Sequence, residues 1–158
     1  MDLLRTIAAR FSPLLNSRWL SEGAVVPDKD TVGRLGERIA ARWLHTRGCR
    51  VLYRNYRAPK GGELDIVCRH GEVLAFVEVK TRTSTAFGRP ADAVTPDKQQ
   101  LIVRGAQGWL RLLHGKEFPW RFDVMEILLI PGRRPEVNWI QSAFNTEELR
   151  RTLAQRRR

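Results

Sequence analysis

The feature that most constrains this chain is residues 61–82, where apolar and polar residues alternate in two runs around a glycine. An alternation with a period of two predicts two β-strands with one face in a core, and the short break between them predicts an antiparallel hairpin. With a two-residue turn at residues 70–71, Asp65 lies opposite Phe76 and diagonal to Glu78, about 7–8 Å away between backbones. The pattern therefore predicts a core hairpin that carries charged groups.

Three of those charged groups are expected to share one face. Glu78 and Lys80 stand two residues apart on the second strand, so they project from the same side about 7 Å apart. Asp65 on the first strand is close enough to share a cation with Glu78. A Glu-x-Lys pair on an exposed strand is the alternative, because such pairs often arise by chance. The apolar flanks of Glu78 favour a strand well inside a sheet, where a charge needs a partner or a metal.

Composition narrows the classes of partner. The chain has 158 residues, is 42% hydrophobic and carries 28 Lys and Arg against 17 Asp and Glu, a net charge of +11. This length predicts one domain with a core, and the charge favours polyanions such as nucleic acid or an anionic membrane surface. No apolar run approaches the roughly 20 residues of a membrane span. No glycine-rich phosphate loop is present, so no small-molecule cofactor is expected.

The cysteines and the N-terminal segment bear on location. Cys49 and Cys68 do not form a metal-knuckle pattern or a disulfide framework, so reduced thiols in a cytoplasmic protein are expected. Residues 1–20 place apolar residues at helical spacing between arginines, which is not typical of a secretory signal. This segment is interpreted as a loosely docked extension, with a transit peptide or a surface-binding helix as the alternatives.

Helical spacing and turn signals predict the remaining elements. Residues 1–30 are expected to be an extension and linker, residues 31–142 the folded domain, and residues 143–158 a C-terminal helix with a basic tail. The elements expected after residue 30 are a helix capped at Asp30 or Thr31 and ending near Gly48, a strand over 50–57, the hairpin, a loop over 83–94, a helix over 96–114, a strand over 120–130, a short edge strand over 136–140 and a helix over 146–154. This order fits a mixed α/β fold with helices on the sheet faces.

The chemistry of the charged face points to phosphodiester hydrolysis. Two carboxylates, Asp65 and Glu78, suit a hard cation such as Mg²⁺ or Mn²⁺. Such a cation polarises a phosphoryl oxygen and steadies a leaving oxygen. Lys80 is placed to orient an attacking water and to stabilise charge on the phosphate. Glu37 lies on the flank of the buried face of the first helix, among small residues, with an exposed helical glutamate as the alternative.

A set of motifs spread over residues 31–130 resembles a known family. They are Gly33-Arg-Leu-Gly-Glu37-Arg-Ile-Ala40, Asn55, Gly62-Glu-Leu-Asp65-Ile-Val, Phe76-Val-Glu78-Val-Lys80-Thr-Arg82, Phe87-Gly88, Lys98 and Arg121-Phe-Asp-Val124. Together they are similar to the YraN family of endonuclease-like proteins, which is similar to archaeal Holliday junction resolvases. The resemblance implies a restriction-endonuclease-like mixed sheet flanked by helices, with an αβββαβ core. One departure is Leu64, which stands where many such nucleases have proline.

The resemblance also assigns roles to residues. It implies that Asp65 and Glu78 bind the metal, that Lys80 is the catalytic lysine and that Glu37 completes the catalytic site. It further suggests phosphate contacts from Arg82, Thr83 and Lys98 and a water- or phosphate-positioning role for Gln99, each with a solvated or purely structural side chain as the alternative. Glu63 is interpreted either as a supporting acid or as a charge at the strand entry. Asp123 and the three histidines, His45, His70 and His114, are expected to be structural.

Two functions follow from these expectations. The first is a metal-dependent endonuclease that cuts DNA, with branched or junction DNA as the expected substrate, because such DNA presents several phosphate backbones to a basic surface. The second is a nucleic-acid-binding protein with the nuclease fold that does not cleave and acts in recombination or DNA uptake with a partner. The presence of Glu37, Asp65, Glu78 and Lys80 together favours the first. A homodimer is left open.

Overall fold

A five-stranded mixed sheet forms the centre of the chain in the computed structural model, which describes residues 23, 25–85, 94–114 and 116–155. The strands are β1 (Cys49–Arg57), β2 (Glu63–His70), β3 (Val73–Arg82), β4 (Trp120–Leu128) and β5 (Glu136–Phe144), in that spatial order. Only β3 and β4 run parallel. The helices are α2 (Lys29–Thr46), α3 (Pro96–Arg111) and α4 (Thr146–Gln155). The predicted α/β class and the αβββαβ core order are confirmed, with β5 and α4 added.

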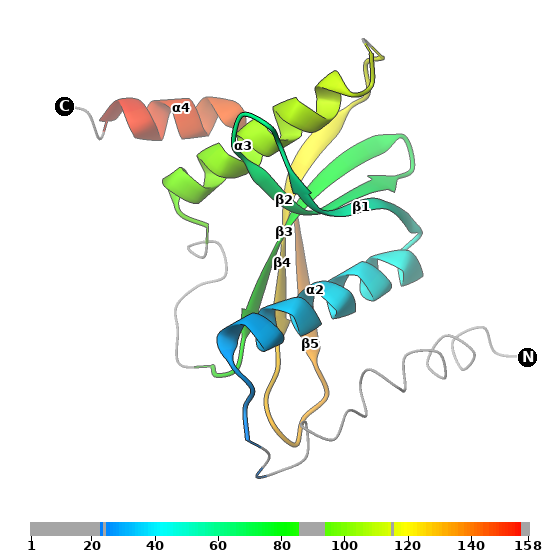
Figure 1. The fold of residues 1–158 in the computed structure, drawn as a ribbon, viewed down its shortest axis with the longest axis vertical. Helices are drawn as coiled ribbons and strands as arrows, with labels where there is room; N and C mark the ends of the chain where they lie inside the picture. Colours follow the sequence, from blue (N-terminus) through cyan, green and yellow to red (C-terminus); the bar gives the residue numbers. More distant parts are fainter. Residues whose placement is uncertain (1–22, 24, 86–93, 115, 156–158) are drawn as a thin grey trace, which may run out of the picture.

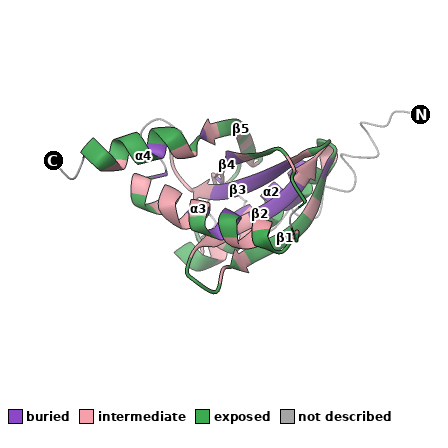
Figure 2. Cartoon of the chain, turned by 90° about the horizontal axis from the view of Figure 1, so that it is seen from above, coloured by how far each residue is buried: buried purple, intermediate pink, exposed green. Residues whose placement is uncertain are grey.

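The alternation of β3 divides the core between two helices. Ala75, Val77 and Val79 belong to the cluster that packs against α2. Phe76 and its neighbours on β4 belong to the cluster that packs against α3. Figure 1 shows α2 and α3 on either side of the curled β1–β2 hairpin, and Figure 2 shows the buried residues concentrated on the central strands while α4 is mostly exposed. Glu78 and Lys80 stand two and four residues after Phe76 on the same strand, so their side chains share its face and lie on the α3 side of the sheet.

Helix α2 begins earlier than its sequence predicts and lies very close to β3. Asp28 caps it by accepting hydrogen bonds from the Thr31 backbone N–H at 2.9 Å and the Thr31 hydroxyl at 2.7 Å, so the predicted caps at Asp30 and Thr31 are wrong. The close contact with β3 occurs at Gly36, where a Cβ would lie 1.8 Å from Thr81 Oγ1. This contact holds the next residue, Glu37, against the end of β3.

The hairpin register differs by two residues from the predicted one. His70 pairs with Val73, so the turn consists of Gly71 and Glu72, with Gly71 at φ +59°. His70 stays in the strand because Arg121 lies 3.2 Å from its ring Nδ1. A two-residue shift keeps each side chain on its face, but it places Asp65 level with Glu78 instead of opposite Phe76.

Strand β5 is longer than the predicted residues 136–140, because a buried aspartate supports its second half. Asp123 is fully buried and accepts hydrogen bonds from Arg121 Nε at 2.9 Å, Trp139 Nε1 at 3.0 Å and the Ser142 backbone N–H at 2.9 Å. Ser142 has a φ of +51° beside an irregularity in the β4–β5 register. Every oxygen of Asp123 therefore has a donor, which agrees with its predicted structural role.

The remaining expectations concern membranes, thiols and segments at the margins. Within the part of the chain that the structure describes, no helix has the length and apolar character needed to cross a membrane. Cys49 and Cys68 are both free and buried. Residues 1–20 and most of the predicted loop, 86–93, lie outside the described residues.

Candidate functional site

Glu78 is the most buried charged group near the end of β3. Its side chain is 3% exposed, and its Oε1 atom lies 2.8 Å from Lys80 Nζ and 3.5 Å from Lys98 Nζ. Its second oxygen, Oε2, is buried and has no hydrogen-bond partner among the described residues. Because a buried carboxylate oxygen without a donor is costly, this atom is a candidate ligand for a cation or acceptor for a donor group.

Asp65 faces Glu78 from β2. Its Oδ2 atom accepts a hydrogen bond from the Val79 backbone N–H at 2.7 Å. Burial and then the neighbouring Glu78 charge raise the pKa of Asp65 to about 7, and the Glu37 charge adds to the shift. Near neutral pH Asp65 is therefore partly protonated, and a cation between the two acids would compete with that proton.

Lys98 belongs to this group of charges, although the sequence left it between a phosphate contact and a solvated side chain. Its side chain is 21% exposed and pairs with both Glu63 and Glu78. Burial lowers the pKa of Lys98, but the hydrogen bond to Glu63 and the Glu78 charge outweigh burial and the net shift is upward. The same hydrogen bond is the main reason that the pKa of Glu63 is lowered. Glu63 is therefore the ion-pair partner of Lys98, which favours its interpretation as a supporting acid over that of a charge at the strand entry.

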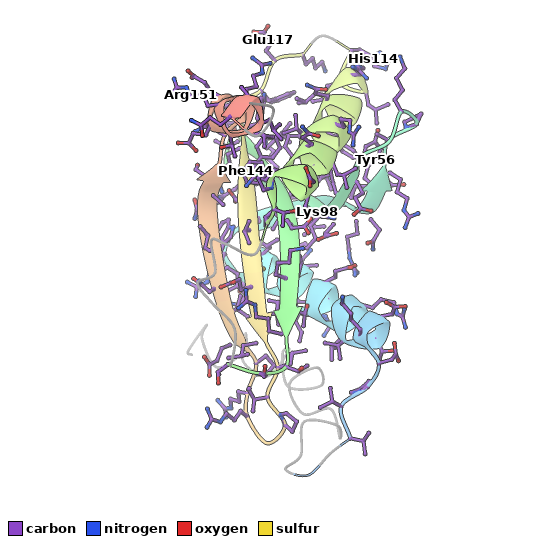
Figure 3. All side chains as sticks on the ribbon, turned by 90° about the vertical axis from the view of Figure 1, so that its left-hand side faces the viewer. Tyr56, Lys98, His114, Glu117, Phe144 and Arg151 are labelled. Carbon is purple, nitrogen blue, oxygen red and sulfur yellow. The ribbon has the colours of Figure 1, made fainter. Side chains whose placement is uncertain are left out.

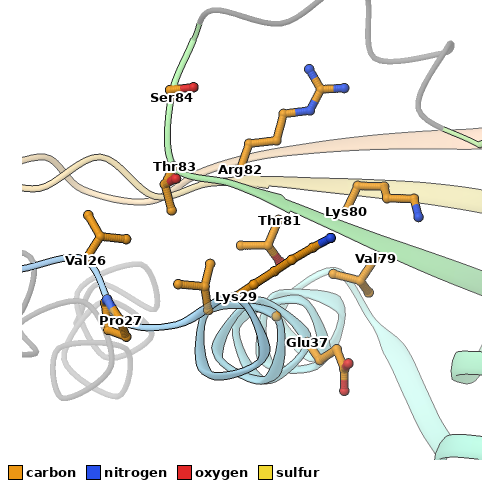
Figure 4. Close-up of a pocket in the computed structure, with 12 residues that line it drawn as sticks. Val26, Pro27, Lys29, Glu37, Val79, Lys80, Thr81, Arg82, Thr83 and Ser84 are labelled. Atoms are coloured by element: carbon orange, nitrogen blue, oxygen red, sulfur yellow. The ribbon is translucent and has the colours of Figure 1, made fainter.

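Glu37 approaches the group from α2 and lines a pocket of about 510 Å³ together with Val79, Lys80 and Arg82. Figure 4 shows the Glu37 carboxylate beside α2 and the Lys80 ammonium across the β3 ribbon from it. Among the described residues, no three His, Cys, Asp or Glu side chains lie close enough together to hold a metal ion. Glu37 thus contributes charge to the site without lying in one cluster with the two acids.

The other candidates differ in their placement. Arg82 and Thr83 line the same pocket as Glu37, and Arg82 lies 3.8 Å from Glu126 Oε1. Gln99 donates its side-chain N–H to the Val94 carbonyl at 3.0 Å, so its amide helps to fix the entry to α3. Of the suggested phosphate-contacting groups, Arg82, Thr83 and Lys98 border the charged site, whereas Gln99 is directed to the backbone.

Glu126 was missed by the sequence reasoning. It pairs with Lys80 across the β3–β4 register, its side chain is 13% exposed, and its Oε1 atom is buried without a hydrogen-bond partner among the described residues. A signal was present, because Glu126 interrupts the apolar run of β4 at a position of the same parity as Phe122 and Val124. Without the register, however, no sequence pattern places it beside Lys80.

Comparison with known protein families adds an independent line of evidence. A family model described as "Uncharacterised protein family UPF0102" matches residues 36–127. This chain belongs to the UPF0102 family. That family is the YraN nuclease-like group, so the resemblance carried by the motifs is confirmed. The match contains every acid and lysine of the site from Glu37 to Glu126.

Several relatives carry the same family description. A UPF0102 protein of Nocardia farcinica is 44% identical over 124 residues, which cover 77% of this chain and 94% of the relative. A UPF0102 protein of Pelobacter propionicus is 48% identical over 120 residues, which cover 75% of this chain and 85% of the relative. A UPF0102 protein of Beutenbergia cavernae is 50% identical over 102 residues, which cover 63% of this chain and 84% of the relative. The aligned part therefore makes up more than four-fifths of each of these relatives.

The donor set of this UPF0102 chain fits a hard divalent cation. Asp65 and Glu78 supply carboxylate oxygens, the ligands that Mg²⁺ and Mn²⁺ prefer. The Oε2 atom of Glu78 is an acceptor without a donor among the described residues. Burial and then the Glu78 charge raise the pKa of Asp65 to about 7, and a cation between the two acids would favour the ionised form. A cation that keeps several waters needs only one or two protein carboxylates, so two acids are sufficient.

Proposed function

We propose that this protein is a metal-dependent endonuclease that hydrolyses phosphodiester bonds in DNA, with branched or junction DNA as its substrate. The observation that carries the proposal is the pair of the half-buried Asp65 and the buried Glu78. One carboxylate oxygen of Glu78 has no partner among the described residues, and two lysines lie at its other oxygen. A buried charged group of this kind costs stability and so is typical of a functional site. The net charge of +11 and the family motifs support nucleic acid as the substrate.

In this proposal Asp65 and Glu78 hold Mg²⁺ or Mn²⁺. When bound, the cation supplies Lewis-acid polarisation of a phosphoryl oxygen and neutralises charge at the leaving oxygen. Lys80, which is 31% exposed, presents its ammonium group to the scissile phosphate and stabilises its developing charge. Lys98 stays fixed by Glu63 and keeps Glu78 in place. Glu37 accepts a hydrogen bond from the attacking water and orients it.

The pocket beside the site provides a path for the DNA backbone. It is lined by three cations, Lys29, Lys80 and Arg82, and by Thr83 and Ser84, whose hydroxyl groups can donate to phosphate oxygens. Figure 4 shows these side chains around the end of β3. Glu37 is the one carboxylate among the described residues that line this pocket. Its negative charge repels a phosphate, whereas its oxygens can accept a hydrogen bond from a water. The strand would thus enter along β3 and reach Lys80.

The test compares cleavage with binding. Wild-type protein, Lys80→Ala and the exposed control Lys116→Ala are incubated with four-way, flapped and linear DNA in Mg²⁺, Mn²⁺ or EDTA. We expect wild type and the control to cut branched DNA with either cation, Lys80→Ala to cut at least about 100-fold more slowly, and all three to bind with similar affinity. Binding by the wild type without cleavage under any cation would refute the proposal and favour a non-cleaving binding protein.

A further inference from the structure

A second pocket, separate from the charged site, lies between the β1–β2 connection and α3. Its volume is about 420 Å³, which is within the range of small-ligand sites. The residues on which the argument rests are Tyr56, Pro59, Lys60, Arg104 and Arg111. Figure 3 shows Tyr56 on the hairpin beside α3, with Lys98 near the start of that helix.

The walls of this pocket are built by close backbone packing. In the connection, the Ala58 N–H donates to the Gly62 carbonyl at 3.0 Å and the Gly61 N–H donates to the Ala58 carbonyl at 3.0 Å. A Cβ on Gly62 would lie 2.4 Å from the Gly105 backbone nitrogen, and one on Gly108 would lie 2.7 Å from Ala58 Cβ. The connection therefore rests directly on the backbone of α3, which leaves little room for it to shift.

The charge of the pocket has one sign. Lys60, Arg104 and Arg111 line it, and its lining contains no carboxylate. Lys60 and the two arginines are exposed, and no ion pair joins any of them to another residue that the structure describes. Three cations around a concave surface favour an anion, and arginine forks match the oxygens of a phosphate.

An aromatic group stands at one side of the pocket. The ring of Tyr56 lies 5.2 Å from Trp109 and 5.8 Å from Tyr53, and Tyr53 lies 5.4 Å from Trp109, as measured between ring centroids. Tyr53 is 50% exposed, whereas Trp109 Nε1 is buried and has no hydrogen-bond partner among the described residues. The packing fixes Tyr56 as a rigid flat surface next to the cations. A flat ring beside phosphate-binding groups suits a nucleotide base.

We propose that this pocket binds one unpaired nucleotide of a nucleic-acid strand, with its phosphate on Lys60, Arg104 and Arg111 and its base against Tyr56. One part of this proposal rests on the proposed nuclease function: the same strand continues from the pocket to the charged site. Arg104 follows Lys98 by six residues on α3, which is about 9 Å along the helix axis. The substrates would therefore be gapped, flapped or branched DNA.

The experiment measures binding in EDTA by fluorescence anisotropy, so that cleavage plays no part. The probes are a labelled 20-nucleotide single strand, a 20-base-pair duplex and a duplex with a three-nucleotide gap. The variant Lys60→Gln/Arg104→Gln/Arg111→Gln is compared with Arg50→Gln/Arg133→Gln/Arg134→Gln, which removes three exposed cations elsewhere. Tyr56→Leu tests the aromatic contact, with Tyr56→Phe as the conservative variant and circular dichroism as the check on folding.

We expect Tyr56→Leu to weaken the binding of single-stranded and gapped DNA about tenfold and to leave duplex binding unchanged. Tyr56→Phe, which keeps the ring, should bind all three probes like the wild type. For the single strand, the logarithm of the binding constant falls linearly with the logarithm of the salt concentration, and the pocket triple variant should reduce the size of that slope by about two. The control triple variant should reduce it less. Equal losses for duplex and gapped DNA, or for the two triple variants, would overturn the proposal. The binding measurements contain no divalent cation and do not depend on cleavage. If the protein fails to cut DNA in the cleavage assay, the nuclease function is refuted, while the nucleotide-binding pocket is still tested by these binding measurements.

Discussion

Replacing Asp65 with asparagine should make the metal-free protein more stable at alkaline pH. Burial and the Glu78 charge raise the pKa of Asp65 from 3.8 to about 7. Because the folded pKa lies above the unfolded one, the stabilising effect of protonated Asp65 is complete below pH 3.8 and is lost as the pH rises through 7. Asparagine cannot ionise and therefore avoids this loss.

The size of the effect follows from the shift. A difference of about three pKa units corresponds to about 4 kcal/mol of unfolding free energy at pH 8. About 2 kcal/mol of that loss is already present at pH 5, so the wild type should lose a further 2 kcal/mol or so between pH 5 and pH 8. The asparagine side chain retains an oxygen to accept from the Val79 N–H, so the Asp65→Asn variant should keep most of the hydrogen bond at 2.7 Å.

Urea unfolding in EDTA at pH 5, 6.5 and 8 measures this difference. Wild type, Asp65→Asn and the exposed control Glu117→Gln are compared, and only Asp65→Asn should show a stability advantage that grows with pH. Mg²⁺ should then stabilise the wild type at pH 8 and have little effect on Asp65→Asn, since ligand binding adds to the stability of the folded state. Parallel pH profiles for wild type and Asp65→Asn would refute the reasoning that burial and Glu78 strain this carboxyl group.

Two further predictions concern the packing around the site. Gly36→Ala should destabilise the protein by about 1–3 kcal/mol through overpacking, because its Cβ would lie 1.8 Å from Thr81 Oγ1. The control Gly33→Ala has nothing within 4 Å of its Cβ and should be neutral or stabilising by up to about 1 kcal/mol in thermal unfolding. Asp123→Ala should cost about 3–5 kcal/mol in urea unfolding, because it leaves the mostly buried Arg121 without its ion-pair partner and removes the acceptor of Trp139 Nε1. A loss below about 1 kcal/mol would contradict that account.

Much of the fold could be predicted because its signals are local. Thr95 was predicted to cap the second helix, and it does so by accepting a hydrogen bond from the Lys98 N–H. The alternation of β3 predicted that Glu78 and Lys80 share a face, and an ion pair joins them. The turn was placed one residue early because Gly71 suits either position of a two-residue turn. The contact that keeps His70 in β2 comes from Arg121, which is 51 residues away in sequence.

The parts of the site that could not be predicted depend on contacts between distant elements. Lys98 meets Glu78 because the start of α3 lies over the start of β2 and the second half of β3, and no spacing in the sequence expresses that approach. Glu126 comes beside Lys80 through the parallel β3–β4 register, which joins strands separated by a helix. A periodic pattern specifies the face of a strand, whereas its neighbour is set by tertiary packing.

The charges of the site are balanced when Asp65 is protonated, and they favour a cation when it is ionised. In the ion-paired group around Glu78, three carboxylates, those of Asp65, Glu78 and Glu63, face two ammonium groups, those of Lys80 and Lys98. Outside this group Glu37 and Glu126 are offset by the cations Lys29 and Arg82, so they do not change the sum. With Asp65 protonated the sum is zero, since two negative charges balance two positive ones. Replacing that proton by a divalent cation gives three negative and four positive charges, a sum of +1, which one phosphodiester group neutralises. Metal affinity should therefore rise with pH through about 7, and the loaded site should favour a phosphate over water.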